Sequence, residues 1–68
     1  MEEINLLNKY PGKWFDARTL AQLTKKSRST IVVKMRKLCE NIVTRNMYEV
    51  KQRSVKLGRT SKFEWSRG

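Results

Sequence analysis

The segment ARTLAQLTKKSRSTIVVKMRKLCE, from Ala17 to Glu40, decides the fold of this chain. In its second half, apolar residues recur at i, i+4, i+7 and i+11, which is the period of one helix face. These residues are Ile31, Met35, Leu38 and Ile42. The first half carries a shorter apolar set, made of Leu20, Ala21 and Leu23. The sequence therefore predicts two helices, over residues 17–24 and about 28–41, each with one buried face.

Capping residues and a short basic break support these two helices. Asp16 and Ser27 stand just before the first and the second helix, where their oxygens can accept backbone N–H groups. Two short helices, a tight turn and a basic outer face on the second helix form a helix-turn-helix. Its turn usually holds Gly and then an apolar residue, but here it holds Lys25 and Lys26. We therefore expect either a longer turn or a Lys26 that covers the core with its methylenes while its ammonium reaches outward.

The charge of the chain is strongly unbalanced. Sixteen Lys and Arg residues against six Asp and Glu residues give a net charge of +10. Eleven of the sixteen cations lie in two runs without an acidic residue, Lys25 to Lys37 and Lys51 to Lys62. This placement predicts a polyanion as the partner.

Size and composition exclude several classes of protein. A chain of 68 residues predicts one domain, residues 1–68, with a compact core. The single cysteine, Cys39, excludes an intramolecular disulfide, and without any His we expect no zinc site, so Cys39 is interpreted as a small buried hydrophobe. No apolar run approaches the roughly 20 residues of a membrane span, and the acidic start is unlike a signal peptide. We therefore expect a cytoplasmic protein.

The residues before the helix-turn-helix predict a helix and a short extended piece. Residues 2–9 form the helix, with acidic residues in its first turn where they suit the helix dipole. Pro11 and Gly12 end it, because proline cannot continue a helix. The segment from Lys13 to Phe15 is then extended, and we expect its aromatic residues, Trp14 included, to join the core.

A β-hairpin is predicted after the helix-turn-helix. Apolar and polar residues alternate over residues 46–53 and again over residues 62–66, which is typical of strands. The stretch from Ser54 to Ser61 contains Gly58 and mixes Ser, Thr, Lys and Arg. We expect it to be a loop that is too long for a two-residue turn.

The order helix, short strand, helix, turn, helix and basic hairpin resembles the winged helix-turn-helix fold over essentially the whole chain. Residues 14–40 are similar to part of the MarR-like and FaeA/PapI-like regulators, where an LAxLT phrase precedes S-x-S-T-I/V at the start of the recognition helix. Here the two phrases run from Leu20 to Thr24 and from Ser27 to Ile31. The resemblance implies an α+β, mainly α domain with three helices and a C-terminal hairpin wing. It also implies binding of double-stranded DNA.

The resemblance further implies that the helix over about residues 28–41 enters the major groove, while the hairpin over about residues 46–66 lies on the backbone or in the minor groove. Residues expected to contact bases are Arg28, Ser29, Val32, Val33 and Arg36. Residues expected to contact the DNA backbone are Lys25, Lys26, Ser27, Thr30 and Lys37. Residues expected to contact DNA from the wing are Arg53, Lys56, Arg59 and Lys62. Arginine can offer two donors to guanine, and valine can contact a thymine methyl group.

Simpler interpretations of these residues stay open. Val33 lies where a solvated helix usually has Lys or Glu, but single exposed apolar residues are common, and a dimer contact would also explain it. A basic helix face can be merely solvated, and lysines at a hairpin edge prevent aggregation. A basic helix and a basic hairpin in one small fold favour a nucleic acid.

We therefore expect a sequence-reading DNA-binding protein, most simply a transcription regulator. One alternative is an RNA-binding or ribosome-associated protein whose Tyr48, Phe63 and Trp65 stack on bases. Another is a phage- or plasmid-encoded modulator that binds a protein partner through Val32 and Val33.

Residues for catalysis are scarce. There is no His, and the one Asp, Asp16, is best used as a helix cap. We expect no enzymatic activity, no metal and no cofactor. A homodimer is expected through the first helix or only on DNA, because the winged fold leaves no spare helix for a large interface.

Overall fold

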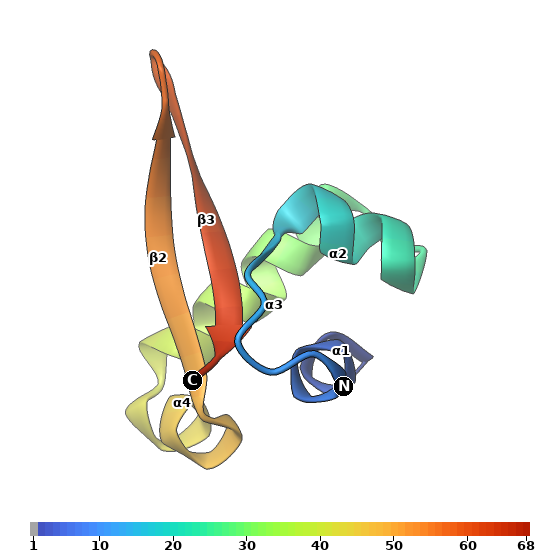
Figure 1. Ribbon diagram of the computed structural model, residues 1–68, viewed down its shortest axis with the longest axis vertical. Helices are drawn as coiled ribbons and strands as arrows, with labels where there is room; N and C mark the ends of the chain where they lie inside the picture. Colours follow the sequence, from blue (N-terminus) through green and yellow to red (C-terminus); the bar gives the residue numbers. More distant parts are fainter. Residues whose placement is uncertain (1) are drawn as a thin grey trace.

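Both helices predicted within Ala17 to Glu40 are present, and both begin at their predicted caps (Figure 1). The computed structural model describes residues 2–68. Its elements are α1 (Glu2–Lys9), β1 (Phe15–Asp16), α2 (Ala17–Thr24), α3 (Arg28–Glu40), α4 (Ile42–Tyr48), β2 (Val50–Leu57) and β3 (Thr60–Arg67). Asp16 Oδ1 accepts the backbone N–H of Thr19 at 2.8 Å, and Ser27 Oγ accepts that of Thr30 at 3.2 Å.

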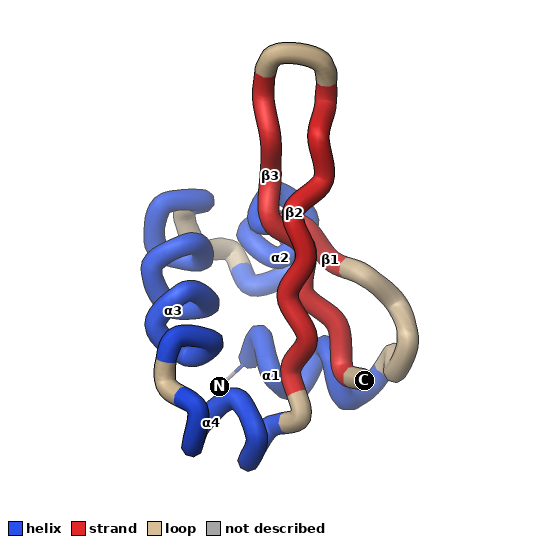
Figure 2. The backbone as a smooth tube through the Cα atoms, turned by 90° about the vertical axis from the view of Figure 1, so that its left-hand side faces the viewer, coloured by secondary structure: helices blue, strands red, loops and turns tan. Residues whose placement is uncertain are grey.

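The helices and the hairpin form a small α+β domain with a winged-helix-like arrangement, which confirms the predicted fold class. The sheet has three antiparallel strands in the order β1-β3-β2 (Figure 2). The far end of the β2–β3 hairpin projects beyond the helices as a two-stranded ribbon, while α4 lies at the opposite end of the molecule (Figure 1). The fold therefore places α3 beside the base of a free-standing wing.

The hairpin is longer than predicted, and its turn is tighter. β2 and β3 pair over all eight residues of each strand. Only Gly58 and Arg59 remain in the turn, and Gly58 has a positive φ of 62°, which glycine adopts without strain. The predicted loop over residues 54–61 is wrong. Most of these residues are exposed in the projecting ribbon, so burial does not impose on them the alternation by which a strand is recognised.

A fourth helix, α4, replaces the predicted start of the hairpin. We expected the stripe of α3 to continue to Ile42 and a strand to begin at Asn46. Instead Asn41 leaves the helical conformation (φ −87°, ψ 111°), and its Oδ1 accepts two backbone N–H groups of the following turn. Ile42 is therefore exposed, and Glu49 ends α4 in the left-handed conformation with φ 54°. A helix of seven residues is too short to show a clear period in the sequence.

The core lies between the helices and the sheet. Its ten buried apolar residues are Ile4, Leu7, Phe15, Leu20, Ala21, Ile31, Met35, Leu38, Val50 and Trp65. Two other residues that we expected in the core, Trp14 and Cys39, are only half-buried. Leu23, which we expected on the buried face of α2, is exposed. The guanidinium carbon of Arg53 lies 4.1 Å from the centroid of the Trp14 ring, so Trp14 supports β2 from outside the core.

An ion pair between the half-buried Lys26 and the buried Glu3 fixes the turn of the helix-turn-helix against α1. Lys25 ends α2 in the left-handed conformation with φ 58°, and Lys25 to Ser27 form a turn of ordinary length. Lys26 Nζ lies 3.1 Å from Oε1 of Glu3, which is fully buried. Burial acts to raise the pKa of Glu3, but hydrogen bonds from a backbone N–H and from Lys26 outweigh it and lower the pKa. The Lys26 ammonium therefore points inward, contrary to prediction.

A second ion pair joins the hairpin to the start of α2. Lys62 Nζ lies 2.7 Å from Asp16 Oδ2 and 3.7 Å from Glu64 Oε2. The Lys62 ammonium, together with the Thr19 N–H and hydroxyl, holds the pKa of Asp16 well below its usual range. Asp16 thus has two roles, because Oδ1 caps α2 while Oδ2 holds β3.

Replacing Asp16 by Asn removes the charge and keeps a side chain that can cap α2. The pKa of Asp16 is lower in the folded chain than in the unfolded chain, so the ion pair stabilises the fold above about pH 4 and loses this contribution as the pH falls further. We expect Asp16→Asn to lower the free energy of unfolding by about 1 kcal/mol near neutral pH and by a smaller amount at about pH 2, where the contribution of the ion pair is partly lost. Urea unfolding at both pH values measures this, and an equal loss at both would show that the ion pair contributes nothing.

Replacing Lys26 by Met removes the ammonium and keeps the stem, so a fully buried carboxylate at Glu3 loses its cation. Because a buried charge without a partner is costly, we expect Lys26→Met to lower the thermal unfolding midpoint more than Glu3→Gln does. The matched control is Lys25→Met, which changes a neighbouring exposed lysine. Equal midpoints for the Lys25 and Lys26 variants would contradict the role of the pair.

Candidate nucleic-acid interface

The five residues predicted to contact bases lie on the sides of α3 that the core leaves free. They are Arg28, Ser29, Val32, Val33 and Arg36. Four of them are exposed, and only Val32 is half-buried. Arg36 is the most constrained, because its guanidinium carbon lies 6.0 Å from the centroid of the Phe63 ring and one nitrogen lies 4.0 Å from Glu40 Oε1. The side chain of Arg28 is therefore less constrained than that of Arg36, although both were predicted to contact bases.

A groove separates the first turns of α2 and α3 from the hairpin. Arg18, Arg28 and Lys62 contribute cations to it, while Val32 and Phe63 supply apolar surface. Arg18 was not among the residues predicted to contact DNA. Its signal was available, because an arginine in the first turn of a helix opposes the helix dipole and needs another reason to be there.

Three of the four predicted wing residues divide between the two faces of the ribbon, and the fourth, Arg59, lies in the turn. The register pairs Lys56 with Ser61, and strand alternation places both on the face that carries the buried Trp65. Arg53 and Lys62 belong to the other face. There Arg53 Nη2 lies 2.7 Å from Glu64 Oε1, and Lys62 binds Asp16.

Of the four predicted wing residues, only the two nearest the tip are free of an ion pair among the described residues. Lys56 and Arg59 are exposed, and neither has a carboxylate oxygen within 4.0 Å in the part of the chain that the structure describes. Arg53 and Lys62 act in the fold as supports for the hairpin. Their predicted contact with DNA would compete with the ion pairs that hold β3 in place.

The five predicted backbone contacts are similarly divided. Lys25 and Lys37 are exposed and lack a carboxylate partner among residues 2–68. Lys26 is turned inward to α1. The hydroxyl groups of Ser27 and Thr30 lie 2.8 Å apart and bond to each other, and Ser27 also caps α3. Two of the five thus present free cations, while three already serve the fold.

Two further cations lie near the other end of α3. A second groove is lined by Arg36, Arg45, Lys51 and Phe63, among other residues. Arg45 and Lys51 were not selected from the sequence as contact residues. Arg45 belongs to α4, which the sequence analysis did not foresee, and Lys51 was set aside although it lies in the second basic run.

Other chemistries have little support among the described residues. No group of three or more His, Cys, Asp or Glu side chains in residues 2–68 is placed to hold a metal ion. Cys39 is half-buried, and burial raises the pKa of its thiol, which disfavours the reactive thiolate. Within the same residues, every helix is too short or too polar to cross a membrane.

No relative of this chain was found among known proteins. No family model matches this chain, and no curated protein or solved structure is significantly similar to it. The likeness to a winged helix-turn-helix therefore stands on topology: helices followed by a C-terminal antiparallel hairpin, with β1 paired to β3.

Proposed function

We propose that this protein binds double-stranded DNA, reads its sequence with α3 and serves as a small transcription regulator. One observation carries the proposal. Exposed cations without an intramolecular carboxylate lie both on α3, at Arg28 and Lys37, and at the wing tip, at Lys56 and Arg59. A phosphate backbone is a ligand that two such separated groups can bind together.

The dimensions of the two elements suit a duplex. α3 has 13 residues, and at about 1.5 Å per residue it is roughly 20 Å long. A helix of this kind fits the major groove, which is about 12 Å wide. The paired strands of the wing have eight residues each, so the tip reaches well beyond α3 toward a neighbouring backbone or minor groove.

The exposed side chains of α3 offer groups that can read bases. Arg28 is not paired with a carboxylate in the described chain, so its two terminal nitrogens can donate to O6 and N7 of guanine. Val33 is exposed and can contact a thymine methyl group. Arg36 would first leave the Phe63 ring and Glu40, which makes Arg28 the better candidate for base recognition.

The acidic residues near this surface do not oppose an anionic ligand. Glu3, Asp16 and Glu64 are each paired with a lysine or an arginine of the same chain. Their charges are therefore compensated internally. Arg28 and Lys37 on α3 and Lys56 and Arg59 at the wing tip keep uncompensated positive charge, which suits attraction of a duplex.

The exposed side chains offer less support for the two alternatives, RNA binding and contact with a protein partner. RNA recognition by stacking would need open aromatic faces, but Trp65 is fully buried, and the exposed fractions of Tyr48 and Phe63 are only 36% and 37%. A protein contact through Val32 and Val33 would have to use a half-buried residue beside an exposed one.

Selection from a pool of randomised duplexes tests the proposed function. We expect one enriched motif, and binding that weakens with salt along similar slopes for the motif and for a scrambled duplex, because phosphate contacts are common to both. Salt-sensitive binding without a motif would contradict base recognition. A tighter complex with structured RNA than with any duplex would favour the RNA alternative.

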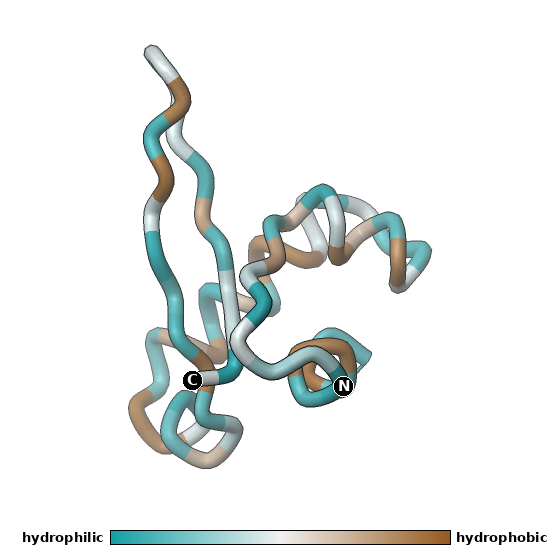
Figure 3. Tube along the Cα trace, viewed as in Figure 1, coloured by the Kyte–Doolittle hydropathy of each residue, from teal (hydrophilic) through white to brown (hydrophobic). Residues whose placement is uncertain are grey.

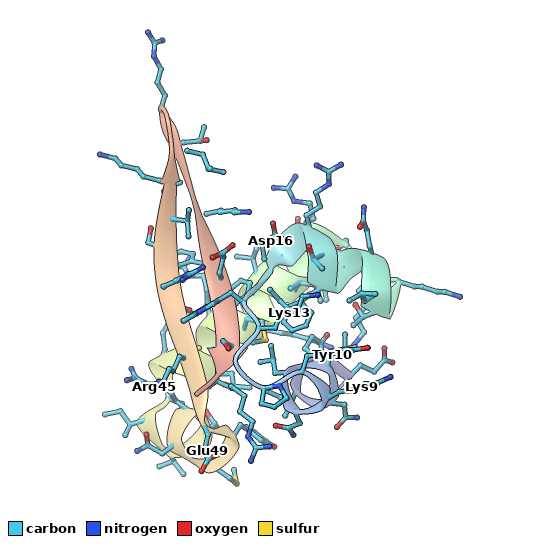
Figure 4. The ribbon with its side chains drawn as sticks, viewed as in Figure 1. Lys9, Tyr10, Lys13, Asp16, Arg45 and Glu49 are labelled. Atoms are coloured by element: carbon cyan, nitrogen blue, oxygen red, sulfur yellow. The ribbon has the colours of Figure 1, made fainter. Side chains whose placement is uncertain are left out.

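Alanine substitutions separate base contacts from phosphate contacts. Arg28→Ala should cost about 1–3 kcal/mol on the selected site and relax its sequence preference, whereas Lys56→Ala should weaken all duplexes alike and reduce the salt slope by about 1. The control is Lys9→Ala, which removes the same charge from α1, where Lys9 lies near the Tyr10 ring (Figure 4). If Arg28→Ala weakens the selected and the random duplex equally, Arg28 does not read a base.

A further inference from the structure

α4 exposes apolar side chains that have no role within the folded chain. None of its residues is buried. Four large side chains form its apolar patch: Ile42 (72% exposed), Val43 (71%), Met47 (62%) and Tyr48 (36%). Hydropathy colouring shows apolar residues on this outlying helix, far from the wing tip (Figure 3). A cluster of exposed apolar residues on one element marks an interaction surface.

Polar contacts hold α4 in place without these side chains. Asn41 caps its first turn, and the Thr44 hydroxyl donates to the Leu38 carbonyl oxygen at 2.8 Å. At its end, the backbone N–H of Glu49 bonds to carbonyl groups of the preceding turn, and the Glu49 carboxylate pairs with Arg67 at 3.2 Å. The apolar patch is therefore not required for the helix to form or to dock.

The charge around α4 differs from that of the rest of the chain. Residues 38–50 contain two glutamates, Glu40 and Glu49, and one arginine, Arg45, a net charge of −1 in a chain of +10. This segment separates the two acid-free basic runs. A nucleic acid would gain less from this segment than from the two basic runs, although Arg36 and Lys51 line a groove together with Arg45. Two copies of a strongly positive protein, by contrast, meet with least repulsion through this surface.

We propose that the apolar patch of α4 binds a second copy of this chain in a closed, two-fold contact. In a two-fold contact the same surface of each copy forms the interface, so the apolar patch of one copy covers the apolar patch of the other. Arg45 has no carboxylate within 4.0 Å among the described residues of its own chain. The carboxylates of Glu40 and Glu49 each lie within 4.0 Å of an arginine of the same chain, Arg36 and Arg67, but both remain exposed and can accept a second cation. Arg45 and Glu49 both lie on the side of the molecule away from the wing tip (Figure 4). The two-fold arrangement sets Arg45 of each copy near a glutamate of the other, so the charges are complementary.

The size of the patch makes this contact weak in dilute solution. α4 has seven residues, fewer than the roughly 20–30 residues that each partner contributes to a standard interface. The large positive charge of each copy also opposes association at low salt. Because salt screens that repulsion and leaves apolar contact intact, self-association strengthens with salt, opposite to the salt dependence of binding to a polyanion.

Analytical ultracentrifugation of the full chain without nucleic acid tests the proposal. We expect a monomer–dimer equilibrium whose dissociation constant falls several-fold between low and high salt, and which stops at the dimer. Ile42→Asp should abolish it, while the matched control Leu57→Asp, a change at an exposed leucine near the wing tip, should not. Because α4 buries no side chain, both variants should keep the circular dichroism of the parent chain.

Three results would overturn the proposal: a monomer at every salt concentration, a dimer that survives Ile42→Asp, or growth beyond the dimer together with sensitivity to Leu57→Asp. The last would indicate a head-to-tail contact between wing and α4. Since no nucleic acid is present, failure here leaves the proposed function untouched, and failure to bind DNA leaves this contact untouched.

A pair of charge variants tests the orientation of the contact. Arg45→Glu reverses the charge of the one cation of α4, and the double change Glu40→Lys and Glu49→Lys reverses the charges of the two glutamates that flank the helix. Neither variant should self-associate, but an equimolar mixture should form a heterodimer. A mixture that remains monomeric would overturn the pairing of Arg45 with the glutamates.

Discussion

The packing of Trp65 is the constraint on which the rest of the structure depends. It is the largest of the fully buried side chains, and it comes from β3, the central strand of the sheet. Phe15 of β1 lies opposite Trp65 in the sheet register. The indole N–H of Trp65 donates to Oε1 of Gln52, on β2, at 2.8 Å. One side chain thus fixes all three strands against the helices. In a chain with ten buried apolar residues, this is the largest apolar contact that positions the wing beside α3, and ion pairs at the base of the wing add to it.

The few acidic residues complete this arrangement. Glu3 holds the turn before α3, while Asp16 and Glu64 hold the base of the wing. Each of these carboxylates therefore fixes an element that presents free cations elsewhere. Because each is paired with a cation of the same chain, its negative charge is compensated and does not repel an anionic ligand. Glu40 and Glu49 lie instead beside α4, where they leave a nearly neutral, apolar surface. The uneven placement of these five carboxylates separates a surface suited to a polyanion from one suited to a second copy.

Local rules predicted the helix-turn-helix well. The caps at Asp16 and Ser27 and the stripe of Ile31, Met35 and Leu38 depend on contacts within a few residues, so they are readable from the sequence. The predictions failed after Glu40. A seven-residue helix and a solvated ribbon carry too little periodicity to be recognised, so α4 was missed and the strands were drawn too short.

By itself, the sequence determined the fold class, the helix-turn-helix and the two basic runs, because propensity, capping and charge are properties of neighbouring residues. Only the tertiary structure decided which cations remain free. In the sequence, nothing distinguishes the cations that form ion pairs from those that stay free. Carboxylates of other segments bind Lys26, Arg53 and Lys62. Lys25, Lys56 and Arg59 lie in the same basic runs and have no such partner among the described residues. The same holds for Ile42, which continues the stripe of α3 in sequence and is exposed on α4 in space. Ion pairing and burial depend on distances across the fold, and those distances exist only once the chain has closed on Trp65.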